Sequence, residues 1–145
     1  MSKKIKFLLI ICLFLNFENS IFAVENFFEN GLQKYNEKKF KDSKLLFQKN
    51  IVFNPKDSKS YLYLAKIYNS EKNVKEEVKN LNTTLLLEPD NEEAIFMLIN
   101  IKLKKSNYSE VKELSEKFIK ICKNLCEKNK SILESLKNLE PKNES

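Results

Sequence analysis

Apolar residues recur along this chain at the three- and four-residue spacing of helices that bury one face, and the pattern itself repeats after 34 residues. Pro55 and Pro89 mark the repeat most clearly, because each follows two apolar stretches of matching phase. The pattern predicts helices over residues 24–38, 40–53, 58–70 and 74–87, a third pair that begins at residue 90 and resumes at residue 107, and a last helix over residues 124–139.

Several of these helix starts carry the spacing of a capping box, in which an Asn or Asp is followed three residues later by a glutamate. The polar side chain at the first position accepts a backbone hydrogen bond that the helix end leaves open. The pairs with this spacing are Asn73 with Glu76, Asp90 with Glu93, Asn107 with Glu110 and Asn124 with Glu127.

Residues of similar size recur at matching positions of the first two units. Phe27, Gly31, Phe40, Phe47 and Ile51 correspond to Tyr61, Ala65, Val74, Leu81 and Leu85. This arrangement resembles tetratricopeptide repeats (TPR) over residues 25–123. The resemblance implies an all-α, TPR-like solenoid of three helix-turn-helix repeats within a domain of residues 24–139. Asn50, Glu77 and Val111 depart from it, because they stand where such repeats place a small residue.

The third repeat lacks the terminal proline, since Lys123 occupies that position. A last repeat needs a cover with one apolar and one polar face, because its stacking side would otherwise meet water. The predicted last helix has these two faces, so we expect it to cap the array, followed by a flexible tail over residues 140–145. Its apolar stripe consists of Leu125, Ile132, Leu133, Leu136 and Leu139.

Residues 1–23 have the pattern of a secretory signal peptide. Three early lysines precede the apolar run Phe7 to Leu15, and Ala23 suits a signal peptidase. A membrane-spanning helix needs roughly 20 apolar residues, more than this run provides. We therefore expect cleavage before Val24 and no stable membrane insertion afterwards. An uncleaved signal anchor is the alternative.

Composition excludes several functions. The chain has one glycine and no histidine, so a phosphate-binding glycine loop and the commonest general base are both absent. We expect no catalysis, no cofactor and no metal site. All 26 basic residues are lysine, and lysine lacks the guanidinium group with which arginine binds phosphates and bases in a bidentate way. Acidic residues also lie four positions from some of these lysines, as Glu113 does from Lys117, and would offset their charge on a helix. A solvated helical surface is favoured over binding of nucleic acid.

Cys122 and Cys126 are separated by four residues across the predicted break before the last helix. In an oxidising compartment two such cysteines usually pair. A structural disulfide is therefore expected. A redox-active dithiol is the alternative, although the spacing is not that of a Cys-x-x-Cys motif.

The aromatic and apolar residues of the repeats form two sets. The first set, Phe27, Phe40, Phe47, Tyr61, Tyr68 and Tyr108, is expected in the core. By resemblance to TPR proteins, the other side of each first helix lines a groove that holds a peptide. The candidate partner-binding residues on that side are Phe28, Leu32, Tyr35, Leu62, Lys66, Asn69, Phe96, Asn100 and Leu103.

These observations predict an exported module that binds a peptide or protein partner in the groove of its first helices. Abundant lysine and asparagine with a short signal suggest a bacterium, and therefore a periplasmic protein, or a secreted one if the cell has a single membrane. The alternatives are a membrane-tethered assembly factor and a thiol–disulfide redox protein that uses Cys122 and Cys126. The pattern fixes no oligomeric state.

Overall fold

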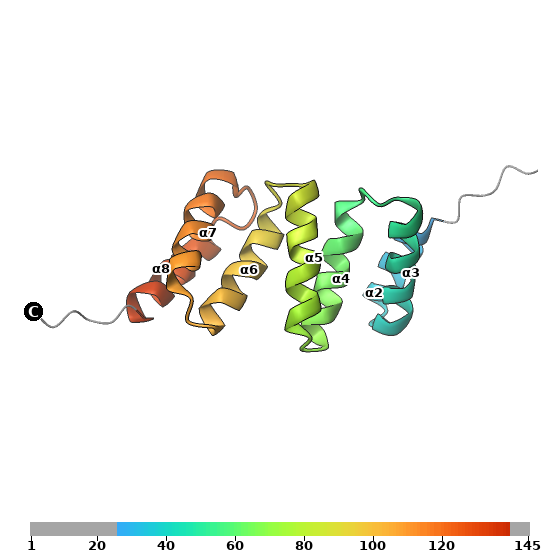
Figure 1. The fold of residues 1–145 in the computed structure, drawn as a ribbon, viewed down its shortest axis with the longest axis horizontal. Helices are drawn as coiled ribbons and strands as arrows, with labels where there is room; N and C mark the ends of the chain where they lie inside the picture. The colour runs from blue at the N-terminus through green and yellow to red at the C-terminus, as the bar shows by residue number, and fades with distance from the viewer. Residues whose placement is uncertain (1–25, 140–145) are drawn as a thin grey trace, which may run out of the picture.

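The structure, a computed structural model, describes residues 26–139, and these form seven α-helices and no strand (Figure 1). The predicted signal segment, residues 1–23, and the predicted tail, residues 140–145, lie outside the described residues. The helices are α2 (Phe27–Asn36), α3 (Phe40–Phe53), α4 (Ser58–Ser70), α5 (Val74–Leu87), α6 (Glu92–Lys104), α7 (Tyr108–Ile121) and α8 (Lys128–Leu139).

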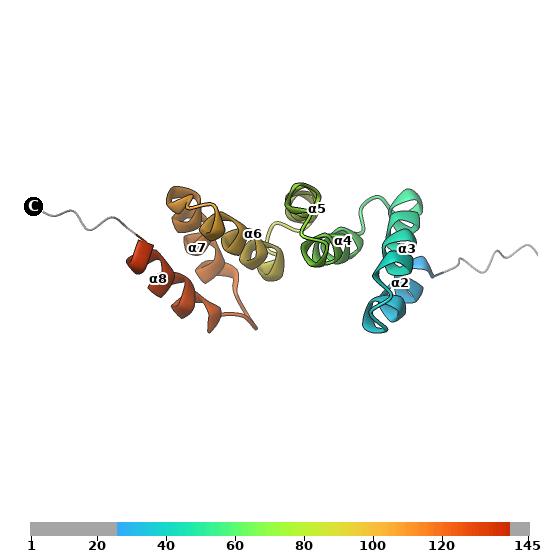
Figure 2. The ribbon, with the colours of Figure 1, turned by 90° about the horizontal axis from the view of Figure 1, so that it is seen from below.

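The helices pack in sequence order. α2 pairs with α3, α4 with α5 and α6 with α7, and each pair also packs on the next. The pairs form a row that α8 closes by packing on α7 and α6 (Figures 1 and 2). The turns within pairs lie along one edge of the row, whereas the connections between pairs lie along the opposite edge (Figure 1). The predicted TPR-like solenoid of three repeats with a C-terminal capping helix is confirmed.

The turn within each repeat is built on one left-handed residue. Lys38, Lys72 and Ser106 have φ angles of 59°, 58° and 54° and lie 34 residues apart. Around Lys72, its own N–H donates to the Asn69 carbonyl at 3.0 Å, and the Asn73 N–H donates to the Tyr68 carbonyl at 2.9 Å. This pair of bonds is the Schellman motif that ends helices. A left-handed residue is usually glycine, yet here lysine or serine occupies every such position.

Asparagine side chains cap four of the helices. The side-chain carbonyls of Asn73 and Asn107 accept the N–H of Glu76 and Glu110, as predicted. Two starts differ from the prediction. α6 is capped by Asn91, one residue after Asp90, because Asn91 accepts the Ala94 N–H at 2.9 Å. α2 begins at Phe27, after the cap Asn26, and ends at Asn36, before the left-handed Lys38.

Burial follows the 34-residue period. Gly31, Ala65 and Ile99 occupy equivalent positions on the three first helices, and all are buried. Three further sets of equivalent positions, on the second helices, are buried as well. Gly31 is needed for the contact with α3, because a Cβ atom there would lie 2.9 Å from the Phe47 ring. The equivalent sets on the second helices are Ser43, Glu77 and Val111; Phe47, Leu81 and Ser115; and Asn50, Thr84 and Phe118.

The interior consists of three clusters, each shared between neighbouring helix pairs. One cluster joins α2, α3 and α4 around Phe47, a second joins α4, α5 and α6 around Leu81, and a third joins α6, α7 and α8 around Phe118. The first helices α4 and α6 therefore contribute to two clusters each. Their side chains are buried on two sides, which limits how much of either helix is left for a partner.

Several predicted core residues are only half-buried. Phe47 is fully buried, but Phe27, Phe40, Tyr61, Tyr68 and Tyr108 keep part of their surface in solvent. These rings lie near the ends of helices, where fewer neighbours surround them. The Tyr61 hydroxyl, for example, donates to the Pro55 carbonyl at 3.3 Å in the connecting turn. These half-buried rings therefore pack beside the turns between helices as well as against the core.

The last helix differs from the prediction at its start. α8 begins at Lys128, and Asn124 does not cap it, because the Asn124 side chain bonds to Glu92 instead. Ile132 and Leu136 of α8 are buried as expected, whereas Leu133 of the same helix is 42% exposed. Leu125 is half-buried in the preceding loop.

Surface charges pair differently from the predicted arrangement. Glu113 and Lys117 form no ion pair in the described part of the chain, where most pairs instead join residues of different elements, as Lys66 of α4 joins Glu93 of α6. In the turn between α2 and α3, hydrogen bonds from Lys39 and, to a lesser extent, Lys34 lower the pKa of Glu37 to about 2.

None of the helices over residues 26–139 has the length and apolar character needed to span a bilayer.

The left-handed lysine gives a test of the turn. Lys72→Gly should stabilise the protein by roughly 0.5–1 kcal/mol, because removing the Cβ relieves about 1–2 kcal/mol of strain while glycine's unfolded-state freedom takes back part of it. Urea unfolding measures the change. Lys117→Gly, an equal loss of charge in the exposed interior of α7, should instead destabilise by about 1 kcal/mol. Equal destabilisation by both variants would contradict the left-handed turn.

Candidate partner-binding site

The nine predicted partner-binding residues occupy equivalent positions on the three first helices, but their surroundings differ. Their side chains range from fully enclosed to exposed, so the three repeats do not offer the same surface. Phe28, Leu32 and Tyr35 lie on α2, Leu62, Lys66 and Asn69 on α4, and Phe96, Asn100 and Leu103 on α6.

The aromatic residues of α2 pack on a tyrosine of α4. The Phe28 ring lies 6.0 Å from the Tyr63 ring and 5.7 Å from the Phe47 ring, and Tyr35 lies edge-on to Tyr63 at 5.0 Å. Such edge-on contacts between rings stabilise a cluster beyond the area that they bury. Tyr63 is not among the predicted residues, although its position beside Leu62 on the same helix turn is a usable signal. Phe28 and Tyr35 remain half-buried.

Leu62 is not part of an exposed row. Its side chain is 7% exposed and packs in the cluster of α4, α5 and α6, where it meets Ala94 and Leu98. Phe96 and Leu103 are half-buried and belong to the cluster that α8 completes, with Phe96 at 6.0 Å from Phe118. The side of the first helices that was predicted to line a groove is therefore interrupted in the middle, at Leu62.

The polar candidates are engaged within the domain. Lys66 Nζ lies 2.8 Å from a Glu93 carboxylate oxygen and 4.6 Å above the centre of the Tyr63 ring, and its side chain is only 20% exposed. Asn69 donates to the buried carboxylate of Glu77 at 2.7 Å. Asn100 donates to the Phe96 carbonyl one turn back at 3.0 Å. Each of these side chains thus has a bond within the domain, and each asparagine amide keeps one further N–H that a partner could use.

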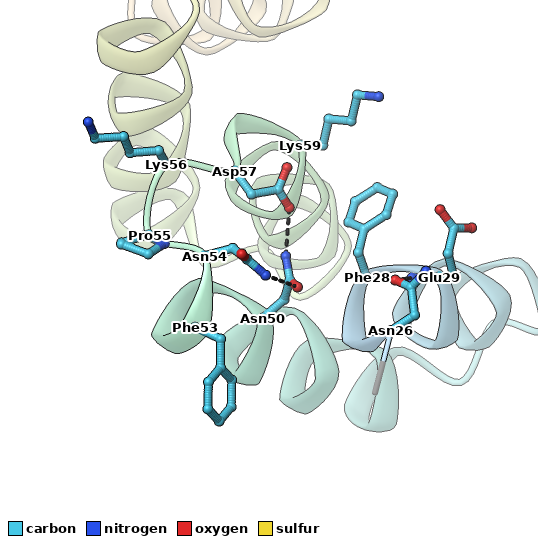
Figure 3. A pocket seen from close by; sticks show the side chains of 10 residues that line it. All are labelled: Asn26, Phe28, Glu29, Asn50, Phe53, Asn54, Pro55, Lys56, Asp57 and Lys59. Atoms are coloured by element: carbon cyan, nitrogen blue, oxygen red, sulfur yellow. Dashed lines mark hydrogen bonds between the residues drawn. The ribbon is translucent and has the colours of Figure 1, made fainter. Parts of the chain in front are cut away.

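An accessible hollow of about 660 Å³ lies where the first repeat meets the second, beside Phe28 (Figure 3). Phe28, Glu29 and Asn26 stand on one side, whereas Phe53 and Pro55 stand on the other (Figure 3). Phe53 is 68% exposed, an unusual degree for such a large apolar ring. The remaining lining residues are Asn50, Asn54, Lys56, Asp57 and Lys59.

A buried polar network forms the floor of this hollow. The Asn50 amide donates to the Asp57 carboxylate at 2.7 Å and to the Ser60 hydroxyl at 2.9 Å, and Ser60 donates to Asp57 at 2.6 Å. Asn54 donates to the Asn50 carbonyl at 3.2 Å (Figure 3). Asn50 thus replaces the small residue expected at its position by joining α3 to the start of α4. The network leaves Phe28 and Phe53 as the apolar groups that a ligand in the hollow would meet.

Comparison with solved structures finds the same arrangement of helices in other proteins. The type III secretion translocator chaperone SycD of Yersinia enterocolitica superposes with a TM-score of 0.71 at 17% identity, over 80% of this chain and 84% of SycD. SycD in complex with a peptide of the translocator YopD gives 0.69 at 16%, over 83% and 96% of the two chains. A chain of the CopN–Scc3 complex gives 0.65 at 19%, over 81% and 71%.

No protein-family model matches the chain, and no curated protein matches its sequence. The identities to the solved structures are low, so the likeness concerns the arrangement of helices.

Within residues 26–139 no three side chains of the metal-binding types gather closely enough to hold an ion.

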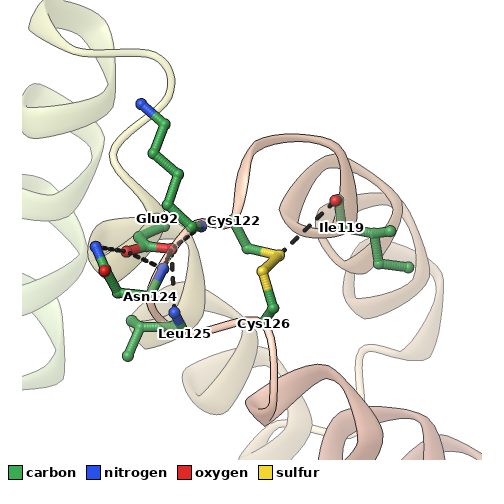
Figure 4. Close-up of a disulfide and its surroundings, with 7 residues drawn as sticks. Glu92, Ile119, Cys122, Asn124, Leu125 and Cys126 are labelled. Carbon is green, nitrogen blue, oxygen red and sulfur yellow. Dashed lines mark hydrogen bonds between the residues drawn. A yellow bond between two sulfur atoms is a disulfide. The ribbon is translucent and has the colours of Figure 1, made fainter.

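The loop that follows α7 is held by an acidic residue that the sequence analysis did not single out. The Glu92 carboxylate accepts the backbone N–H of Lys123 at 2.7 Å, of Asn124 at 3.1 Å and of Leu125 at 3.2 Å, together with the Asn124 side-chain amide at 3.1 Å. The Sγ atoms of Cys122 and Cys126 are bonded and close the same loop (Figure 4). The partners lie more than thirty residues from Glu92, so no local pattern reveals them.

These hydrogen bonds predict the titration of Glu92. The N–H of Lys123, followed by those of Asn124 and Leu125, lowers the pKa of Glu92 below the ordinary value of 4.5. Since the folded pKa is lowered, the stabilisation is complete above pH 4.5 and is lost as the pH falls through the folded pKa. Carboxyl-carbon NMR should show a midpoint below 4.5, and the three amide shifts should follow it. A midpoint at or above that value would contradict the contact.

Proposed function

We propose that this protein is an exported binding module without catalytic activity, which holds a segment of a partner protein against its first helices. The fold supports this proposal, because helical solenoids present long surfaces rather than enclosed reaction sites. The solved neighbour SycD binds a peptide of YopD, a protein segment of the kind proposed here. The absence of histidine from the sequence also agrees with a role without acid–base chemistry.

The hollow between the first two repeats is the proposed centre of contact. Phe28 and Phe53 are its two aromatic lining residues, with the Phe53 ring stacked on Phe27 at 5.5 Å, and Lys56 and Lys59 add positive charge at the rim. An apolar side chain of the partner would enter the hollow beside Phe28, and polar or acidic groups next to it would face the lysines. Aromatic residues that are already held by their neighbours make good anchors, because little conformational freedom is lost on binding. Phe28 is held in this way by Tyr63 and Phe47.

Phe53 provides the sharper test, because it lines the hollow while remaining mostly exposed. Peptides selected from a random display library by the mature chain should carry a large apolar residue. Phe53→Ala should weaken a selected peptide by about 2 kcal/mol, or roughly thirtyfold, as expected for the loss of an aromatic anchor. Titration calorimetry measures the change, and circular dichroism checks the fold.

Val52→Ala is the matched control. Val52 is the preceding residue of α3 and is 74% exposed, but it does not line the hollow. This variant should bind within twofold of the unchanged protein. If the two variants weaken binding equally, or if neither does, the hollow is not the contact and the proposal fails at this site.

Export rests on the lysines and the short apolar run within residues 1–23. We expect the exported form to begin at Val24, as intact-mass measurement of the protein from the cell envelope would show. A chain that begins at Met1 and stays with the membrane fraction would instead support the tethered alternative.

A further inference from the structure

The loop between α7 and α8 combines two constraints on the same few residues. The bond between Cys122 and Cys126 encloses Lys123, Asn124 and Leu125. These three residues donate the backbone N–H groups that Glu92 accepts, at 2.7–3.2 Å (Figure 4). A single short ring therefore contains every backbone donor of the contact with α6.

The disulfide favours the curved backbone that this contact requires. The two Cα atoms are 5.2 Å apart. An extended chain over the same four steps would span about 13 Å, so the bond excludes open forms of the loop. Three successive N–H groups can meet one carboxylate only when the backbone curves around it. Opening the ring releases this curvature, and the bonds to Glu92 weaken with it.

α8 depends on this loop for its position. The helix has 12 residues, and its main contacts are with α7 and α6. Isolated helices of that length are marginal in water. Its buried side chains are Ile132 and Leu136, which cover Ile95, Ile99 and Phe118. Since the main contacts of α8 are with α7 and α6, it can leave with little disturbance of the first two repeats.

We propose that α8 is a lid under redox control, docked while Cys122 and Cys126 are bonded and released when they are reduced. Release uncovers the apolar surface of Ile95, Ile99 and Phe118. It also opens the surroundings of Phe96 and Leu103, the half-buried candidates of the third repeat. The oxidised protein thus offers the hollow between its first two repeats, whereas the reduced protein adds a second apolar surface at the other end. The switch does not depend on the partner-binding proposal.

The reaction requires a dithiol as reductant. One thiolate of the dithiol attacks Sγ of Cys126, whose residue is exposed, and breaks the Sγ–Sγ bond to form a mixed disulfide. The Cys122 sulfur leaves as a thiolate and takes up a proton, and the Ile119 carbonyl oxygen, 3.8 Å away, can accept the hydrogen bond of the new thiol (Figure 4). The second thiol of the reductant displaces Cys126 and closes a new disulfide. Two electrons pass to the protein and two cysteine thiols result.

Hydrogen exchange followed by mass spectrometry tests the switch on the full mature chain. After reduction with dithiothreitol, amides of residues 128–137 should exchange at least tenfold faster, whereas those of α2 to α5 should not change. A Cys122→Ser, Cys126→Ser double variant should behave like the reduced protein without any reductant. The proposal is overturned if α8 keeps its protection while alkylation shows both thiols free, or if α2 to α5 lose protection as well.

Two single variants separate the role of Glu92 from that of charge. In the oxidised protein, Glu92→Gln should speed exchange of residues 123–125 and of α8 by at least threefold. Glu93→Gln, the same change on the next residue, should leave both segments unchanged because Glu93 pairs with Lys66, whereas the loop donates its hydrogen bonds to Glu92. Unchanged α8 exchange in Glu92→Gln, or equal effects of the two variants, would overturn the coupling through Glu92.

Discussion

Each helix pair in this protein is covered by the next, and this mutual burial is the constraint on which the rest of the structure depends. There is no central core among the described residues but a chain of three clusters, linked by α4 and α6. A linking helix must be apolar on two sides: α4 buries Leu64 and Ile67 toward the first repeat, and Leu62 and Ala65 toward the third. Stability is therefore a sum of neighbour contacts, and each end of the row needs its own solution.

Much of the fold follows from local signals in the sequence. The helices 58–70 and 74–87 have the predicted bounds, because Asn73 provides a local cap and the apolar period is undisturbed. The start of α8 could not be predicted in the same way. Asn124 has the spacing of a cap, but Glu92 binds its side chain and backbone across a separation of 32 residues. A distant carboxylate competes with the local cap, and local patterns carry no information about it.

The candidate site was less predictable than the fold, and Leu62 explains why. The 34-residue period identifies equivalent positions, but it does not say which neighbour covers each one. Phe28 packs on Tyr63 and Phe47 and reaches a hollow, whereas Leu62 lies between two further helices and is enclosed. Phe53 was missed because its exposure depends on where α3 ends and the chain turns toward α4. Equivalent residues therefore differ in exposure because their repeats occupy different places in the row of helix pairs.

The Asn50 network also bears on how similar repeats avoid stacking in the wrong order. If α3 met α6 in place of α4, the position of Ser60 would be taken by Ala94, its equivalent 34 residues later. Asn50 would then lose a partner for its buried amide, and an unsatisfied buried donor costs about 1–3 kcal/mol. Apolar contacts alone would hardly distinguish the two arrangements, since leucine packs on either helix. The hydrogen bonds of Asn50 at this junction therefore provide specificity. They favour packing of α3 on α4 over packing on α6 while the chain folds.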